Sequence, residues 1–266
     1  MDEYLDRPDA RIAYDSAGPA GAARTVVVAH SLATSRAWED EAGVLRWGAL
    51  AGSGHRLVRF DSRGHGASSG TAEAEDYTWP SLAADLVAIC DAVSPEMPVD
   101  ALGESTGCGV LLRAVLAAPG RFRRLVLVVP PTTGAERAEQ AELYTAAASM
   151  IELRGIESWQ RILASAAPAP ILQRGGWTRP SWVPVQDELI PSVLRGAAAS
   201  TFPVDEDLRT IHQPTLILAW DTDPSHPLST AEHLAEQLPD SVVEIATTPD
   251  EIRSWAGRAA AFLGRD

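Results

Sequence analysis

The chain has 266 residues, a formal net charge of −14 and a pI of about 4.8, which disfavours nucleic acid and anionic membranes as partners. Every basic side chain is an arginine, and the absence of lysine excludes Schiff-base chemistry and phosphate loops with a Walker lysine.

The length suits one large α/β domain with room for an inserted subdomain. Cys90 and Cys108 lie in apolar helical surroundings, which favours buried core residues over a disulfide framework. The chain opens on an acidic stretch rather than a signal peptide, and no apolar run approaches ~20 residues. We therefore expect a cytoplasmic protein that does not span a membrane.

The first part of the chain alternates strand and helix patterns. The predicted elements are, in order, an antiparallel hairpin at residues 4–14, buried strands at residues 25–29 and 56–60, and an amphipathic helix at residues 80–93. Strands that alternate with helices predict a mostly parallel sheet with helices on both faces.

The strongest motif is Gly103-Glu104-Ser105-Thr106-Gly107, which is Gly-x-Ser-x-Gly between a predicted strand and an apolar helix at residues 110–118. This arrangement is typical of a nucleophile elbow, in which the serine occupies a strained turn with its hydroxyl exposed. Side chains at either glycine would collide with the neighbouring strand and helix. A glycine-rich strand-to-helix loop without chemistry is the other interpretation.

A further buried strand at residues 125–129 stops at Pro130-Pro131, after which the pattern changes. Residues 132–203 are predicted to be helical, with Trp159, Trp177 and Trp182 as candidates to line a pocket. Strand patterns resume at residues 215–219 and 242–245. We therefore predict a core of residues 1–131 and 204–266, with residues 132–203 inserted at the ligand-binding edge of the sheet.

Three more stretches complete a recognisable set. They are His30-Ser31-Leu32, the loop that starts at Asp61 and contains Arg63 and Gly66, and Asp221-Thr222-Asp223-Pro224-Ser225-His226, each following a predicted strand. Together with the elbow they resemble the α/β-hydrolase superfamily, and most closely its branch of small esterases, lactonases and cofactor-free haloperoxidases. The resemblance covers residues 12–262.

The resemblance implies a role for several residues. Ser105 matches the nucleophile, and the backbone N–H groups of Leu32 and Thr106 match the oxyanion hole. Asp223 matches the acid after the late strand, and residues 132–203 match a helical cap. It assigns Asp61, Arg63 and Gly66 to a structural loop, and it implies no cofactor and no metal.

This sequence departs from the family's pattern at three places. Ser31 and Trp220 both stand where the family usually has glycine, and we expect Trp220 to pack against the cap rather than narrow the pocket. More seriously, the family's general base is a histidine after the last strand, and no histidine follows His233. Instead, Thr248, Pro249 and Glu251 predict a helix start with a capping box.

Another histidine could serve as the base. His30 and His65 lie in loops where the family's histidine is usually structural, and His55 and His212 precede strands, at the opposite edge of the sheet. His233 lies inside a helix that Ser229 and Glu232 are predicted to open with a capping box. His226, three residues after Asp223, is the remaining candidate, although a loop histidine packed beside Pro227 is the plainer interpretation.

Two functions are therefore open. One is a serine hydrolase that acts on a small ester, lactone or thioester through Ser105, Asp223 and His226. The other is a protein that keeps the fold but binds a small hydrophobic molecule or catalyses a lyase-type step. In either case the partner is a small molecule.

Overall fold

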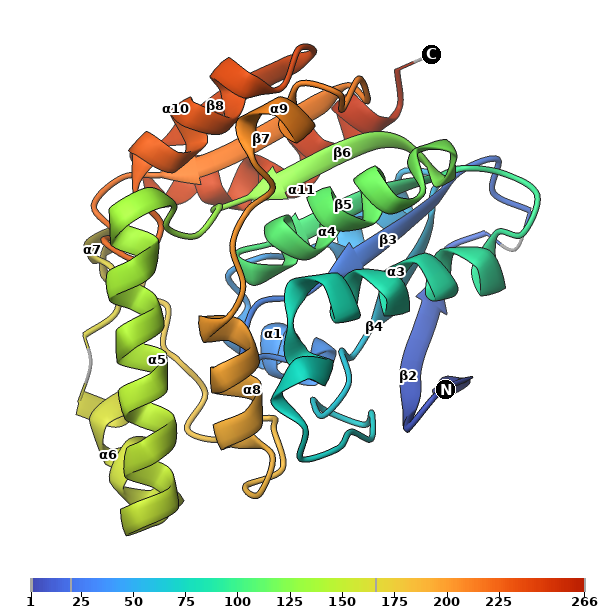
Figure 1. Ribbon diagram of the computed structural model, residues 1–266. Coiled ribbons are helices and arrows are strands. Elements are labelled where there is room, and N and C mark those ends of the chain that lie inside the picture. Colours follow the sequence, from blue (N-terminus) through green and yellow to red (C-terminus); the bar gives the residue numbers. More distant parts are fainter. Residues whose placement is uncertain (1, 20, 166, 266) are drawn as a thin grey trace.

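Figure 1 shows the computed structural model, which describes residues 2–19, 21–165 and 167–265. Four residues of the ranges predicted above (Met1, Ala20, Ala166 and Asp266) lie outside the described residues. One sheet has the strand order β1-β2-β4-β3-β5-β6-β7-β8. Its strands are β1 (Glu3–Arg7), β2 (Ala10–Ala17), β3 (Thr25–Ala29), β4 (Arg56–Phe60), β5 (Val99–Glu104), β6 (Phe122–Val128), β7 (Thr215–Trp220) and β8 (Ser241–Ala246).

The pairing confirms the predicted hairpin and the predicted mostly parallel sheet. β1 and β2 pair antiparallel, β2 pairs antiparallel to β4, and β4, β3, β5, β6, β7 and β8 run parallel to one another. The helices are α1 (Arg36–Ala42), α2 (Gly48–Gly52), η1 (Ala74–Tyr77), α3 (Trp79–Val93), α4 (Thr106–Ala117), η2 (Pro119–Arg121), α5 (Gly134–Arg154), α6 (Ile156–Ser165), α7 (Pro170–Arg174), α8 (Ile190–Ala198), α9 (Asp205–Leu208), α10 (Leu228–Gln237) and α11 (Pro249–Leu263). Within the described ranges, none of these helices has the length and apolar character needed to cross a bilayer.

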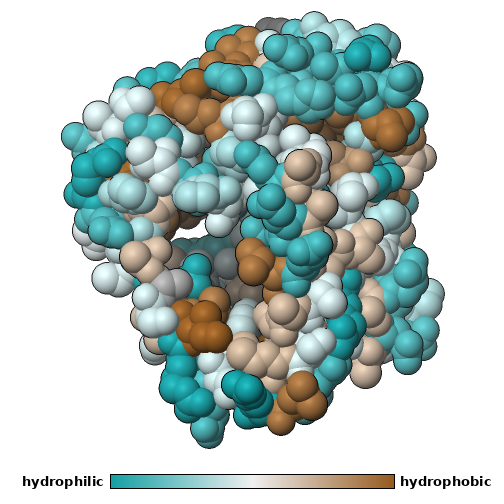
Figure 2. Space-filling view, turned by 60° about the vertical axis from the view of Figure 1, so that its left-hand side comes forward, coloured by the Kyte–Doolittle hydropathy of each residue, from teal (hydrophilic) through white to brown (hydrophobic). Residues whose placement is uncertain are grey.

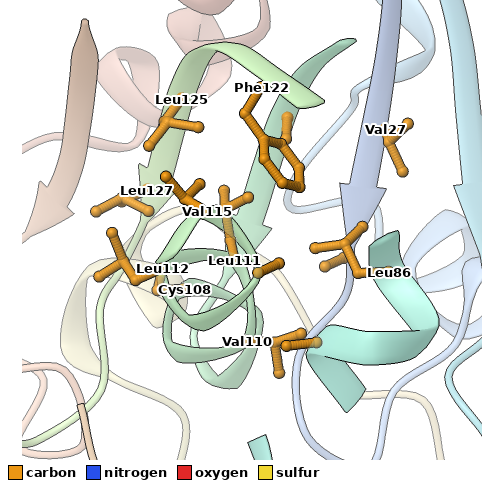
Figure 3. Packing of buried hydrophobic residues seen from close by; sticks show 14 of the residues in the cluster. Val27, Leu86, Cys108, Val110, Leu111, Leu112, Val115, Phe122, Leu125 and Leu127 are labelled. Atoms are coloured by element: carbon orange, nitrogen blue, oxygen red, sulfur yellow. The ribbon is translucent and has the colours of Figure 1, made fainter. Parts of the chain in front are cut away.

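Two apolar layers enclose the sheet, because its central strands are apolar on both faces. Along β3, Val27 faces the layer formed by α3, α4 and α10, whereas Val26 and Val28 face the layer formed by α2 and α11. Figure 3 shows the first layer, where side chains of α4 lie against those of β6. This packing fixes α4, and with it the serine that precedes it.

Residues 132–203 leave the sheet after β6 and return before β7, and they contain α5, α6, α7 and α8. α5, α6 and α8 share a separate apolar cluster that includes Ile151, Trp159 and Val193, whereas Ile171 of α7 packs in the layer formed by α2 and α11. Figure 1 shows α5 and α8 beside the carboxyl ends of the parallel strands. We call this segment the helical insertion.

Candidate active site

Ser105 occupies a strained turn between β5 and α4, with φ 48° and ψ −114°. Non-glycine residues rarely adopt a positive φ. The flanking glycines explain how the turn closes. A Cβ on Gly103 would lie 2.3 Å from the carbonyl oxygen of Gly107, and one on Gly107 would lie 2.2 Å from that of Ala29. Only glycine fits at either position, so the strained turn is present as predicted, and Ser105 itself is half-buried between buried neighbours.

The loop after β7 folds Asp223 and His226 together through a tight turn. The His226 N–H donates to the Asp223 carbonyl at 3.1 Å, and the Ser225 N–H donates to the Asp223 carboxylate Oδ1 at 3.0 Å. Asp at the first position of a turn and Pro at the second are favoured, because the carboxylate caps the backbone and proline presets φ. Asp223-Pro224-Ser225-His226 therefore encodes this turn locally.

The turn places the His226 ring between Asp223 and Ser105. Nδ1 of His226 lies 2.8 Å from Oδ2 of Asp223, and Nε2 lies 2.8 Å from Oγ of Ser105. Because a carboxylate only accepts, Nδ1 carries the proton, which leaves Nε2 free to accept from the serine hydroxyl. The three side chains thus form a continuous chain of hydrogen bonds.

Three donors hold the Asp223 carboxylate in its ionised form. Burial raises its pKa, but the hydrogen bonds from His226, the Ser225 N–H and the Trp220 indole together lower the pKa below its ordinary value. Asp223 is therefore an anion at neutral pH. In the part of the chain that the structure describes, no group of three or more His, Cys, Asp or Glu side chains is placed to hold a metal ion.

The other histidines have different partners. His30 accepts from the Ser62 N–H at 2.8 Å through Nε2, and its Nδ1 lies 2.7 Å from the Ser31 carbonyl, so both ring nitrogens are engaged. Burial lowers the pKa of His65 to about 3, which keeps that ring neutral. His233 pairs with Asp205 at 3.0 Å. Of the histidines in the described ranges, His226 is the one hydrogen-bonded to Ser105.

The connection after β8 is as short as predicted. The strand ends at Ala246, and α11 begins at Pro249 with Thr248 as its N-cap. Thr248 and Glu251 form the predicted capping box, and the Thr247 N–H also donates to Glu251 at 2.8 Å. The capping box predicted at Ser229 and Glu232 is wrong. α10 begins at Leu228, so its N-cap is Pro227, two residues before Ser229, and proline has no side chain able to cap.

Backbone strain is concentrated at this edge of the sheet. Among the described residues, five non-glycine residues have a positive φ, and four of them follow parallel strands: Ala33, Ser105, Val129 and Thr222. Such conformations cost about 1–3 kcal/mol each and tend to mark functional sites. Leu32 lies in the turn after β3 beside Ala33, and Thr106 is the first residue of α4, where backbone N–H groups lack helical partners.

The loop after β4 is held by ion pairs. Asp61 accepts from the Arg36 guanidinium at 3.0 Å and from the backbone N–H groups of Arg36 and Ala67. Arg63 forms a two-pronged bond to the buried Asp85, at 2.7 and 2.9 Å. Asp61 therefore attaches the loop to α1 and Arg63 attaches it to α3, which agrees with the structural role that the family resemblance implies for this loop.

A carboxyl pair beneath the elbow was not predicted. Glu104 is 1% exposed, accepts from the Trp47 indole at 2.5 Å and shares a hydrogen bond with Glu39. Burial and the charge of Glu39 raise the pKa of Glu104 well above its ordinary value. Glu104 lies 57 residues after Trp47 and further still from Glu39, so no local pattern could have brought it to either of them.

Trp220 packs differently from the expectation. Its indole stacks on Trp255 of α11, with ring centroids 5.7 Å apart and planes 12° apart, and its Nε1 donates to Oδ2 of Asp223 at 3.0 Å. Its stacking partner thus belongs to the core rather than to the helical insertion. The sequence did hold one indication of the hydrogen bond to Asp223, because Trp220 ends a predicted strand and lies three residues before that acid.

The helical insertion is attached to the core around the candidate site. Its apolar cluster packs against Leu32 and Ala33, and the Gly66 N–H donates to the Pro184 carbonyl at 2.7 Å. Figure 2, which turns the side of α5, α6 and α7 forward, shows that this face is hollowed.

The three tryptophans of the helical insertion have structural contacts. Trp159 is buried in the insertion's own cluster, Trp177 donates to the Gly43 carbonyl at 3.2 Å, and Trp182 donates to Glu41 at 2.7 Å. Two of the indoles therefore dock the insertion onto the region around α1. That any of them lines a substrate pocket stays a prediction.

The chain is similar to known proteins both in sequence and in structure. A family model described as the alpha/beta hydrolase fold matches residues 24–252. "Putative carbamate hydrolase RutD" of Caulobacter sp. (strain K31) is 28% identical over 243 residues, which cover 86% of this chain and 84% of that protein. The enol-lactonase from Burkholderia xenovorans LB400 is similar in structure, with a TM-score of 0.80 at 18% identity over 99% of this chain and 100% of that one. An esterase from Exiguobacterium antarcticum has a TM-score of 0.76 at 18% identity over 100% of both chains. With the matching family model covering most of its length, the chain belongs to the α/β hydrolase fold family.

Proposed function

We propose that this protein is a serine hydrolase in which Ser105 is the nucleophile, His226 the general base and Asp223 the acid that orients His226. The observation that carries the proposal is the position of the His226 ring, with Nε2 2.8 Å from the Ser105 hydroxyl and Nδ1 2.8 Å from Asp223. These distances lie within the range that proton transfer to a general base requires. They favour catalysis over a purely binding role, because binding needs no activated serine.

The first half-reaction acylates Ser105. Its oxygen attacks the carbonyl carbon of the substrate while its proton passes to Nε2 of His226, and the imidazolium that forms is stabilised by the Asp223 carboxylate. The carbonyl π electrons move to oxygen, where the N–H groups of Leu32 and Thr106 are proposed to stabilise the oxyanion. When the oxyanion collapses, the bond to the leaving group breaks and the leaving group takes the proton from Nε2.

The second half-reaction releases the acid. Water attacks the acyl carbon and gives its proton to Nε2, and collapse of the second oxyanion breaks the bond to Ser105 Oγ, which recovers the proton. His226 therefore acts in both halves. Without it, an acyl-enzyme made with a reactive ester would stall.

The substrate class follows from the site and the relatives. We propose a small ester, lactone or thioester, and the name of the RutD relative adds carbamates. The helical insertion is proposed to act as a cap, since its cluster packs on Leu32 and Ala33 and Arg174 reaches the Thr247 carbonyl at 3.0 Å.

The test is the hydrolysis of p-nitrophenyl acetate by the wild type and by Ser105→Ala, His226→Ala and Asp223→Asn. We expect kcat to fall by about 10⁴- to 10⁶-fold in each variant, because members of such a triad act as a unit. His233→Ala is the matched control, since His233 also pairs with an aspartate, at 3.0 Å, but does not contact Ser105.

The outcomes separate the two functions. Full activity in Ser105→Ala would rule out the serine mechanism. Slow wild-type turnover that does not change in His226→Ala would favour the binding or lyase role. Mass spectrometry after treatment with a fluorophosphonate should place the adduct on Ser105 in the wild type and show much slower labelling in His226→Ala.

A further inference from the structure

Trp220 is the last residue of β7 and lies within reach of both members of the turn that follows. Its Nε1 donates to Oδ2 of Asp223 at 3.0 Å, the same oxygen that accepts from His226. Its ring also meets that of His226 edge to face, with centroids 6.1 Å apart and planes 89° apart. One side chain thus contacts the proposed acid and the proposed base together.

The indole is itself held on two sides. Its backbone pairs with Ala246 of β8, and its ring stacks on Trp255, which is 2% exposed in the layer formed by α11. A ring fixed by a strand and by a buried stack has little freedom to rotate. The donor Nε1 is therefore presented at a fixed point beyond the carboxyl end of β7.

The need for such an anchor arises from the unusual loop. Asp223 and His226 share one turn, so neither is held by a second loop after β8, and Thr222 in the same loop has a positive φ of 63°. A turn attached to the core at its ends alone could tilt as a unit away from Ser105. A hydrogen bond from the strand-end residue to the carboxylate opposes that movement and fixes which carboxylate oxygen faces His226.

We infer that Trp220 is a positioning residue that holds the Asp223 carboxylate, and through it the His226 ring, in register with Ser105. This inference rests on the proposed function of Ser105, Asp223 and His226. Trp220 is buried, and it acts through Asp223 rather than on the substrate directly. Loss of its N–H should therefore lower kcat and leave KM almost unchanged.

The kinetic test compares Trp220→Phe, which keeps an aromatic ring in the stack but removes the N–H, with Trp38→Phe, which removes an indole N–H that donates to the Trp182 carbonyl at 3.1 Å. We expect kcat for p-nitrophenyl acetate to fall about tenfold in Trp220→Phe, with KM within about twofold, because a hydrogen bond to a charged group is lost. We expect Trp38→Phe to keep kcat within about twofold. Equal losses in both variants, or an unchanged kcat in Trp220→Phe, would overturn the positioning role.

A second measurement does not depend on turnover. The indole N–H resonance of Trp220, assigned by its disappearance in Trp220→Phe, should move in a ¹⁵N-edited spectrum of Asp223→Ala, whereas that of Trp182, whose acceptor is Glu41, should stay in place. A Trp220 resonance that does not move would show that the bond to Asp223 is absent. Activity that survives in Ser105→Ala would instead reject the proposed function, and the spectrum would still report on the Trp220 contact.

Discussion

His226 and Asp223 are joined side chain to side chain at 2.8 Å while they also close the same turn through their backbones. The proposed base and acid therefore form one rigid unit rather than meeting from two loops. The unit is fixed to the sheet by β7 and begins α10 on its other side. Any displacement of this loop moves both groups relative to Ser105.

Restoring a histidine after β8 should not replace His226. In the double variant His226→Ala, Thr247→His we expect kcat to stay below about 1% of wild type, because the Thr247 N–H is bonded to Glu251 and the chain enters α11 two residues later. Steady-state kinetics with p-nitrophenyl acetate check this. Recovery to a tenth of wild-type activity would show that the short connection can still deliver a base.

Gly107→Ala should severely destabilise the protein or abolish its activity. The new Cβ would lie 2.2 Å from the Ala29 carbonyl oxygen of β3, and the clash cannot be relieved without moving α4 away from the sheet. We expect a loss of at least about 3 kcal/mol in the free energy of unfolding. Urea denaturation measures it. Gly257→Ala is the control, since a Cβ there meets nothing within 4 Å on an exposed face of α11, and it should stabilise by about 0.5–1 kcal/mol.

Asp61→Asn should lower the free energy of unfolding by about 2 kcal/mol at neutral pH, because the buried Arg36 guanidinium loses one charged partner and keeps Asp2 and Asp15. Burial raises the pKa of Asp61, but the hydrogen bond from Arg36 and further contacts lower it below the ordinary value. The stabilisation is therefore fully present above the unfolded pKa of about 3.9 and is lost as the pH falls through the folded pKa.

Urea titrations between about pH 3.5 and pH 7 give the free energy of unfolding of the wild type and of Asp61→Asn. The difference between the two should be constant above about pH 6 and should become smaller towards acid pH. Asp6→Asn is the control, since the Asp6 side chain is 93% exposed and should change stability by less than about 0.5 kcal/mol. If this difference in the free energy of unfolding became larger at acid pH, the assignment of a lowered pKa to Asp61 would be contradicted.

Glu104→Gln should stabilise the protein at alkaline pH. Burial and the charge of Glu39 raise the pKa of Glu104, so the folded state favours its protonated form. Wild-type stability then falls as the pH rises above the unfolded value of about 4.3, whereas the neutral amide carries no such penalty and can still accept from Trp47. The melting temperature of the variant should exceed that of the wild type at about pH 8 and match it near pH 4.

Glu157→Gln serves as the comparison for this prediction, because the Glu157 side chain is 84% exposed on α6. Its melting temperature should follow that of the wild type across the whole pH range. If Glu104→Gln were less stable than the wild type at pH 8, the Glu39–Glu104 pair would be ionised in the folded state and its raised pKa would be wrong.

The features that sequence could predict are those set by neighbours in the chain. The strands, the glycine-bracketed Ser105 turn and the capping box at Thr248 all depend on residues within a few positions. His226 emerged by elimination, and its turn with Asp223 is also local. The Glu39–Glu104 pair and the Trp220–Trp255 stack could not be predicted, because they join residues that are distant in sequence and that meet only once the sheet and its helices have packed. Ser229 and Glu232 fit a capping pattern, but the helix starts before them, at Leu228.

Because His226 closes the set of proposed catalytic groups, β8 and α11 contribute no reacting group. They support the site through strand pairing with β7 and through the stack of Trp255 on Trp220. The exposed link at Pro239 and Asp240 thus divides the chain into a part that carries the whole proposed chemistry and a strand–helix unit that carries none. Separately produced fragments cut at this link would make a complementation pair, in which hydrolysis reports the docking of one fragment on the other. A fold whose base follows β8 does not divide in this way, since there the second fragment would bring a reacting group of its own.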